Sequence, residues 1–243
     1  MKIKAFSLAM WCMILILIAC ASNNSLEKKL QLFQTPPGYE YPLDSTGYSE
    51  IKNSLFFTKN GNTEVFTMNS NNLHVVDFNN DGDKDVVYHD NRHYQTTMLL
   101  VKKGNDFVEI WKRPGRLVDV KQGKKTTFFV LNNAIGCLNE ATLSELIIKN
   151  DTVILENILT LHVDTKLNSI NKTLKRQRVS GVLRTQAVED DTKKKDPCTG
   201  DVKIGNQLKT IEDKEVTVIK NQDEWLLVVF KEVDRSMIGW VKI

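Results

Sequence analysis

The chain has 243 residues, of which 41% are hydrophobic, and its 33 Lys and Arg residues nearly balance its 30 Asp and Glu residues. This length suits one large or two small domains with a packed core. The near-neutral charge gives no reason to expect a nucleic-acid partner.

Residues 1–19 have the features of a secretory signal peptide. Lys2 and Lys4 form a short positive segment, and an almost uninterrupted apolar run over 6–18 follows it. The run is shorter than the ~20 residues that a membrane-spanning helix needs, but it suits a signal peptide. The sequence therefore predicts that the mature protein works outside the cytoplasm.

The end of this segment, Leu17-Ile18-Ala19-Cys20, resembles the lipobox of bacterial lipoproteins. In that family the cysteine becomes the first mature residue and carries acyl chains, so the resemblance implies lipidation of Cys20. Two or more acyl chains hold a protein stably on a membrane. We therefore expect a lipid-anchored protein of the bacterial cell envelope, in the periplasm or on the cell surface. The alternative is an ordinary signal peptide with a chance cysteine.

Residues 20–45 are expected to form a tether. A brief helix over 26–34 is predicted to end at Pro36-Pro37-Gly38, because proline and glycine interrupt helices. A flexible span of this length reaches ~27 Å on average. That reach would lift a domain off the bilayer surface.

From residue 46 to 165, short apolar runs alternate with turn residues, as in a series of β-hairpins. The pattern predicts an all-β domain, built as propeller-like blades or as a two-sheet β-fold. The expected strands form two groups of four, at 73–78, 85–88, 98–102 and 106–111, and then at 117–120, 126–131, 143–148 and 152–156.

An acidic loop at 77–85 places oxygen-bearing residues at every second position. These are Asp77, Asn79, Asp81, Asp83 (through its main-chain carbonyl) and Asp85. Calcium binds six to eight such oxygens, and Gly82 permits a sharp turn. The nine residues carry four carboxylates against one lysine, which repel one another without a cation. We therefore predict a calcium site with a structural role; an acidic turn without metal is the alternative.

The loop lacks the EF-hand glutamate, because its twelfth position is Tyr88. The pattern D-x-N-x-D-G-x-x-D, followed by Val86-Val87, instead resembles the calcium loop of FG-GAP and related integrin-type propeller repeats. In that family the loop joins two strands of one blade. Only one such loop is present, and about 120 residues are too few for seven blades. The resemblance therefore implies a partial propeller or a two-sheet domain.

Residues 166–178 are rich in Lys and Arg and are expected to form a linker or an exposed strand. From 179 to 243 the chain resembles a bacterial SH3-like domain, a small β-barrel. The resemblance rests on Val182-Leu183-Arg184, Gly205, Val216-Thr217-Val218, Trp225-Leu226-Leu227-Val228 and Gly239-Trp240-Val241.

A polar insertion at 190–201 is longer than the usual loop of that family, so the resemblance implies no particular ligand. Trp225, Phe230 and Trp240 are the candidate ligand-binding aromatics. The alternative is an unrelated small barrel in which the tryptophans form the core.

The chain has four cysteines. Cys12 lies in the signal peptide and Cys20 in the lipobox, which leaves Cys137 and Cys198 as a candidate disulfide in an oxidising compartment. The bridge would close a loop of about 60 residues and contribute roughly 4 kcal/mol in the loop-entropy model. Two separate thiols are the alternative.

No nucleophile elbow, P-loop, dinucleotide-binding or C-x-x-C motif occurs, so we expect no enzyme. The SH3-like resemblance implies a binding or scaffold lipoprotein that recognises a cell-wall peptide or an envelope protein. The lipobox, the all-β domain and the single acidic loop also resemble periplasmic lipoproteins that inhibit lysozyme-like peptidoglycan hydrolases. An immunity lipoprotein of that kind is therefore the second hypothesis.

Overall fold

The computed structural model describes eleven segments of the chain. They are residues 25–36, 39, 41–42, 56–59, 62–65, 73–90, 95–133, 139–171, 174–196, 198–233 and 235–243. The predicted signal peptide, Cys20 and Cys137 lie outside them. Within the described residues no helix is long and apolar enough to cross a membrane.

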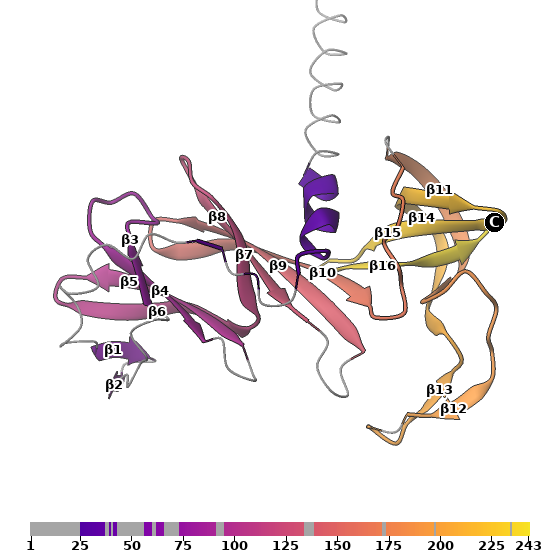
Figure 1. The fold of residues 1–243 in the computed structure, drawn as a ribbon, viewed down its shortest axis with the longest axis horizontal. Helices are drawn as coiled ribbons and strands as arrows, with labels where there is room; N and C mark the ends of the chain where they lie inside the picture. The colour runs from indigo at the N-terminus through magenta and orange to yellow at the C-terminus, as the bar shows by residue number, and fades with distance from the viewer. Residues whose placement is uncertain are drawn as a thin grey trace, which may run out of the picture.

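The fold is all-β, which confirms this part of the predicted fold class, and its strands form two large sheets and one small hairpin (Figure 1). The first sheet has six strands in the order β2-β1-β6-β5-β4-β3. Its strands are β1 (Phe56–Lys59), β2 (Asn62–Val65), β3 (Leu73–Val76), β4 (Asp85–Asp90), β5 (Thr96–Lys103) and β6 (Asp106–Pro114).

The second sheet has eight strands in the order β11-β14-β15-β16-β10-β9-β8-β7. Its strands are β7 (Arg116–Lys121), β8 (Thr126–Asn132), β9 (Glu140–Lys149), β10 (Thr152–His162), β11 (Lys175–Arg184), β14 (Gln207–Gln222), β15 (Trp225–Lys231) and β16 (Arg235–Lys242). The hairpin consists of β12 (Lys193–Lys195) and β13 (Val202–Ile204).

The two predicted groups of four strands correspond to β3–β6 and to β7–β10, each an antiparallel meander. The local pattern was sufficient because short turns connect neighbouring strands. At the β9–β10 turn, Asn150 and Asp151 have φ of 49° and 59°, the left-handed values that a tight two-residue hairpin turn requires.

The sequence predicts separate domains at 46–165 and 179–243, but strands from both ranges belong to one sheet. β10 pairs in parallel with β16, with Ile158–Leu161 opposite Arg235–Ile238. The C-terminal strands therefore continue the sheet that β7–β10 begin (Figure 1).

The four C-terminal strands of this sheet also close into a ring, because β11 pairs with β16 through Arg184 and Trp240. Gly239 permits this approach of the two strands. A Cβ atom at residue 239 would lie 2.8 Å from Leu183 Cγ and 2.9 Å from the carbonyl oxygen of Arg184. Strands β11, β14, β15 and β16 thus enclose their own small core.

The expected tether at 20–45 is wrong for the part that the structure describes. Residues 25–32, the N-terminal helix, pack on the second sheet (Figure 1). Leu30 is fully buried and belongs to a core cluster with Val118, Leu159 and Trp225. The helix is therefore part of the folded body.

Polar contacts fix the same segment. Lys29 forms an ion pair with Glu145 at 2.7 Å. Arg116, which is fully buried, donates from Nη2 to the carbonyl oxygen of Thr35 at 3.0 Å and from Nη1 to that of Tyr39. A buried guanidinium needs such acceptors, so the segment after the helix satisfies a charge within the fold.

The expectation of a linker at 166–178 is wrong for its described residues, whereas the alternative of an exposed strand is confirmed from Lys175 on. Leu167 and Leu174 are buried in the same cluster as Leu30, and β11 already begins at Lys175. Its leucines hold the segment on the core, and Lys175, Arg176 and Arg178 are exposed on β11.

Replacing Leu30 with Ala tests whether the helix belongs to the fold. The substitution leaves a cavity in the core, so the free energy of unfolding should fall by ~3 kcal/mol. The measurement is urea unfolding of the mature chain with Cys20 replaced by Ser. Gln31→Ala, at the exposed neighbouring position, is the control and should change little. A free tether would leave both variants as stable as the parent.

Candidate functional site

The acidic loop is closed by the carboxylate of Asp77, at the end of β3. Its Oδ1 accepts the N–H groups of Asn80 at 2.7 Å and Asp81 at 3.2 Å, and its Oδ2 accepts that of Gly82 at 3.0 Å. Gly82 has φ of 94°, a value that favours glycine. The loop is therefore held in a tight turn around one carboxylate.

Asp85, the first residue of β4, is fully buried. Its Oδ2 accepts the N–H of Phe78 at 3.2 Å, and its Oδ1 accepts the N–H of Lys102 on β5 at 3.0 Å. Burial raises the pKa of Asp85 to about 7, although these N–H groups act in the opposite direction. The carboxylate joins the loop to the neighbouring strand.

The loop also touches two turns of the second sheet. Asn79 Nδ2 donates to Asp81 Oδ2 at 2.8 Å and to a carboxylate oxygen of Asp151 in the β9–β10 turn. Asn80 Nδ2 donates to the carbonyl oxygen of Gly123 in the β7–β8 turn at 3.2 Å. Sequence reasoning missed Asp151, because the contact spans 72 positions and nothing local signals it.

The loop offers the oxygen donors that calcium prefers. Asp83 is exposed, with a carboxylate oxygen 3.6 Å from Lys102 Nζ. Within the described part of the chain, no three His, Cys, Asp or Glu residues are arranged to hold a metal ion. The carboxylates of Asp77 and Asp85 instead accept backbone N–H groups. Calcium binding therefore stays a prediction from the sequence.

The expected ligand-binding aromatics lie in the core. Trp225, Phe230 and Trp240 are 6%, 6% and 5% exposed. Trp225 and Trp240 pack in the cluster that contains Leu30, and Phe230 packs inside the ring of β11, β14, β15 and β16. This burial contradicts the expectation of an open aromatic groove, because each ring already contacts core side chains.

A second candidate site lies beside residues 192–205, which we call the arm. The arm contains β12 and β13 and projects away from the body of the second sheet (Figure 1). It corresponds to most of the polar insertion that the sequence shows within the SH3-like pattern.

Arg184 fixes the base of the arm, and its side chain is only 6% exposed. Its Nη1 donates to Asp191 Oδ1 at 2.7 Å, to Asn206 Oδ1 at 2.9 Å and to the carbonyl oxygen of Asp190 at 3.2 Å. Asn206 Nδ2 in turn donates to the carbonyl oxygen of Val188 at 2.7 Å. One buried cation thus connects both ends of the arm.

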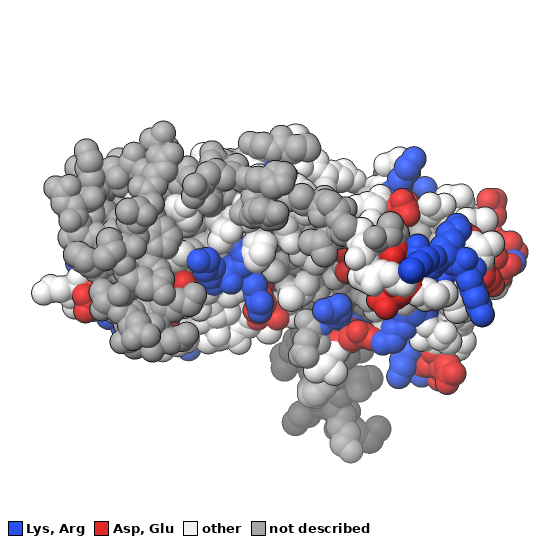
Figure 2. Space-filling model, turned by 90° about the horizontal axis from the view of Figure 1, so that it is seen from below, with Lys and Arg blue, Asp and Glu red and all other residues white. Residues whose placement is uncertain are grey.

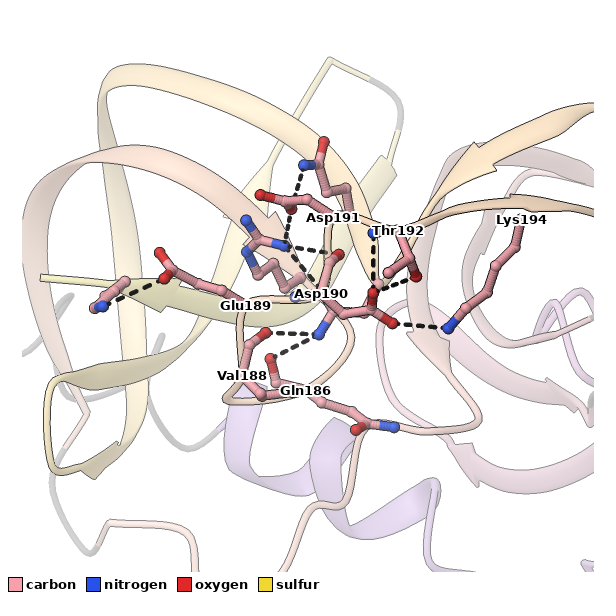
Figure 3. A network of polar contacts seen from close by, with 11 residues as sticks. Gln186, Val188, Glu189, Asp190, Asp191, Thr192 and Lys194 are labelled. Atoms are coloured by element: carbon pink, nitrogen blue, oxygen red, sulfur yellow. Dashed lines mark hydrogen bonds and ion pairs between the residues drawn. The ribbon is translucent and has the colours of Figure 1, made fainter.

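The carboxylate of Asp190 extends this network into the arm (Figure 3). It accepts the N–H of Thr192 at 3.0 Å and its hydroxyl at 2.6 Å, and it pairs with Lys194 Nζ at 2.8 Å. Gly205 is required opposite, because a Cβ atom there would lie 1.8 Å from the carbonyl oxygen of Asp190. The hydrogen bond to Lys194, followed by those to Thr192, lowers the pKa of Asp190.

Asp196 orders the tip of the arm. Its Oδ1 accepts the N–H groups of Cys198 at 2.8 Å and Thr199 at 3.2 Å, and its Oδ2 pairs with Lys203. The hydrogen bond to Lys203, together with these N–H groups, lowers the pKa of Asp196 to about 2. Cys198 is disulfide-bonded. Pairing with Cys137 stays a prediction, since Cys137 lies outside the described residues.

A cleft of about 930 Å³ lies between the arm and the body. Its charged lining residues carry both signs; they are Glu140, Asp164, Asp190, Asp196, Lys194, Lys203 and Lys209. His162 lines the cleft too, and burial lowers the pKa of its imidazole. Figure 2 likewise shows basic and acidic side chains interspersed on the end of the molecule that carries the arm.

No known protein family, no curated protein and no solved structure matches this chain. The site therefore has to be interpreted from its own geometry.

The pKa of Asp85 makes a testable contribution to stability. Between pH 4 and 7 the folded protein keeps a proton on Asp85 that the unfolded chain has lost, so folding becomes less favourable as the pH rises. In the presence of a chelator, this part of the slope should disappear in Asp85→Asn, measured by urea unfolding at several pH values. Asp83→Asn, at an exposed position of the same loop, should retain the slope. Equal slopes in the parent and Asp85→Asn would contradict the assignment.

Proposed function

We propose that the chain is a membrane-anchored extracytoplasmic binding lipoprotein that recognises a cell-wall peptide in the cleft beside the arm. The observation that carries this proposal is the cleft itself. Its volume of about 930 Å³ lies within the range of ~300–1,000 Å³ that small-ligand pockets occupy. The lipobox at Cys20 supports the anchor, and the ring of β11, β14, β15 and β16 supports the SH3-like resemblance.

The mixed charge of the cleft favours a peptide over a neutral glycan. Cell-wall peptides carry free carboxylates and amino groups. Lys194, Lys203 and Lys209 line the cleft and would face the carboxylates in such a complex, and Glu140 and Asp164 would face the amino groups. Because Arg184 fixes the arm, the cleft keeps its shape without the ligand, which reduces the ordering cost of binding.

Two tryptophan substitutions on either side of the arm test the proposal. Val188 lines the cleft, whereas Val202, which is 67% exposed, does not. Val188→Trp fills the cleft and should reduce co-sedimentation of the mature chain (Cys20→Ser) with purified peptidoglycan sacculi at least tenfold. Val202→Trp, the matched control, should leave it unchanged. Truncation before residue 179 is no substitute, because β10 would lose its partner β16.

The same pair of variants addresses the inhibitor hypothesis. Lys193, Lys195 and Val202 are exposed on the arm and do not line the cleft. Together they form a basic and partly apolar surface that suits the acidic cleft of a glycan hydrolase. No pelleting by the parent chain, together with slowed lysis by a hydrolase that Val202→Trp relieves, would replace the peptide proposal with inhibition.

Calcium binding at the acidic loop is the second part of the proposal. Its support is the set of oxygen donors from Asp77 to Asp85, with Asp151 adjacent. We expect millimolar calcium to raise the melting temperature at pH 7.5, as for weak extracellular sites with Kd of ~10⁻⁴–10⁻³ M. Asp81→Asn should weaken this shift, and the same concentration of magnesium is the control. An unchanged melting temperature would establish the loop as a metal-free turn.

A further inference from the structure

We propose that the surface around the start of the N-terminal helix rests on an anionic lipid bilayer, with the arm and its cleft facing away. This inference rests on the proposed acylation of Cys20. It adds an orientation and a lipid-contacting surface to that anchor.

The first argument is the length of chain between the anchor and the folded body. The first described residue of the helix is Ser25, and the burial of Leu30 together with the ion pair of Lys29 and Glu145 fixes the helix on the second sheet. Five Cα–Cα steps separate Cys20 from Ser25, which is ~18 Å at full extension. Covalent geometry alone therefore keeps the start of the helix close to the lipid headgroups.

The second argument is the charge beside the helix start. A groove of about 400 Å³ there is lined by Leu26, Arg176, Glu215 and Lys231. Arg176 pairs with Glu215 at 3.3 Å. Lys231 is exposed and makes no ion pair within the described residues.

Lys175 and Arg235, each next to a groove residue, are likewise exposed, without an ion pair in the described part of the chain. These three unpaired cations outnumber Glu27 on the helix, because the other nearby acids, Glu145, Glu215 and Glu232, are already paired with Lys29, Arg176 and Lys209. Such an excess is attracted to anionic headgroups within a Debye length of the surface.

The arm lies on the other side of the molecule. Figure 1 shows the start of the helix at the top and the β12–β13 hairpin at the bottom. A bilayer at the helix start therefore leaves the cleft pointing toward the cell wall, where a wall peptide can enter it.

Lysine labelling on vesicles tests this orientation. The mature chain is coupled through the Cys20 thiol to a maleimide lipid in vesicles of phosphatidylethanolamine and phosphatidylglycerol, with the coupling site confirmed by peptide mapping. An amine reagent is then added, and mass spectrometry gives its rate of reaction with each lysine. A lysine that rests on the membrane is shielded from the reagent. Relative to the uncoupled chain, Lys175 and Lys231 should react at least threefold more slowly. Lys193 and Lys195, exposed on the arm, are internal controls and should be unchanged.

A variant with twenty Gly and Ser residues inserted after Ala21 tests whether the short distance to the lipid causes the slower labelling. It should restore the labelling rates of Lys175 and Lys231. Equal rates at all four lysines in the parent chain would overturn the proposal. Protection of the same size on vesicles of phosphatidylcholine alone would overturn the role of the cations.

The outcome is independent of the proposed function. Mass spectrometry of the N-terminus of the protein from bacterial membranes tests acylation itself, and sedimentation with sacculi tests the cleft. A chain without acyl groups in cells would remove the proposed anchor, whereas the labelling of the coupled chain reports only on the orientation.

Discussion

The parallel pairing of β10 with β16 is the constraint on which the rest of the structure depends. It connects a meander that starts at β7 to a ring of strands formed by the last third of the chain. Without it, the cluster around Leu30, Leu159, Trp225 and Ile238 would be divided between two separate bodies. Because the sheet is continuous, the N-terminal helix covers residues from both parts at once, and these residues form one shared core cluster.

This shared core also positions the polar features. β11 closes the ring against β16, and its last residue, Arg184, is thereby held where it can reach both ends of the arm. A buried guanidinium is costly unless it is fully hydrogen-bonded. Burial of Arg184 therefore requires the acceptor oxygens of Asp190, Asp191 and Asn206 to lie around it. The arm and the cleft follow from the closure of the ring, and the binding role that we propose depends on that geometry.

The acidic loop likewise connects distant parts of the chain, because it joins the first sheet to turns of the second sheet. Asp85 is buried between β4 and β5, and Asn79 and Asn80 reach turns of the second sheet. The loop therefore contributes to the joint between the two sheets, whether or not a cation occupies it. Metal binding at this place would strengthen a contact that hydrogen bonds already make.

Local patterns were enough to identify the strands β3–β10 and their hairpin turns, because alternation of apolar residues and left-handed turn residues such as Asn150 act over a few positions. The same patterns indicated the acidic loop and the polar insertion that became the arm. Only the tertiary structure decided that β10 and β16 share a sheet, since Ile158 and Arg235 carry no local signal of their pairing. It also decided that Leu30, Trp225 and Trp240 are core residues. A side chain is buried only when residues distant in sequence cover it, and that cover is a property of the folded chain.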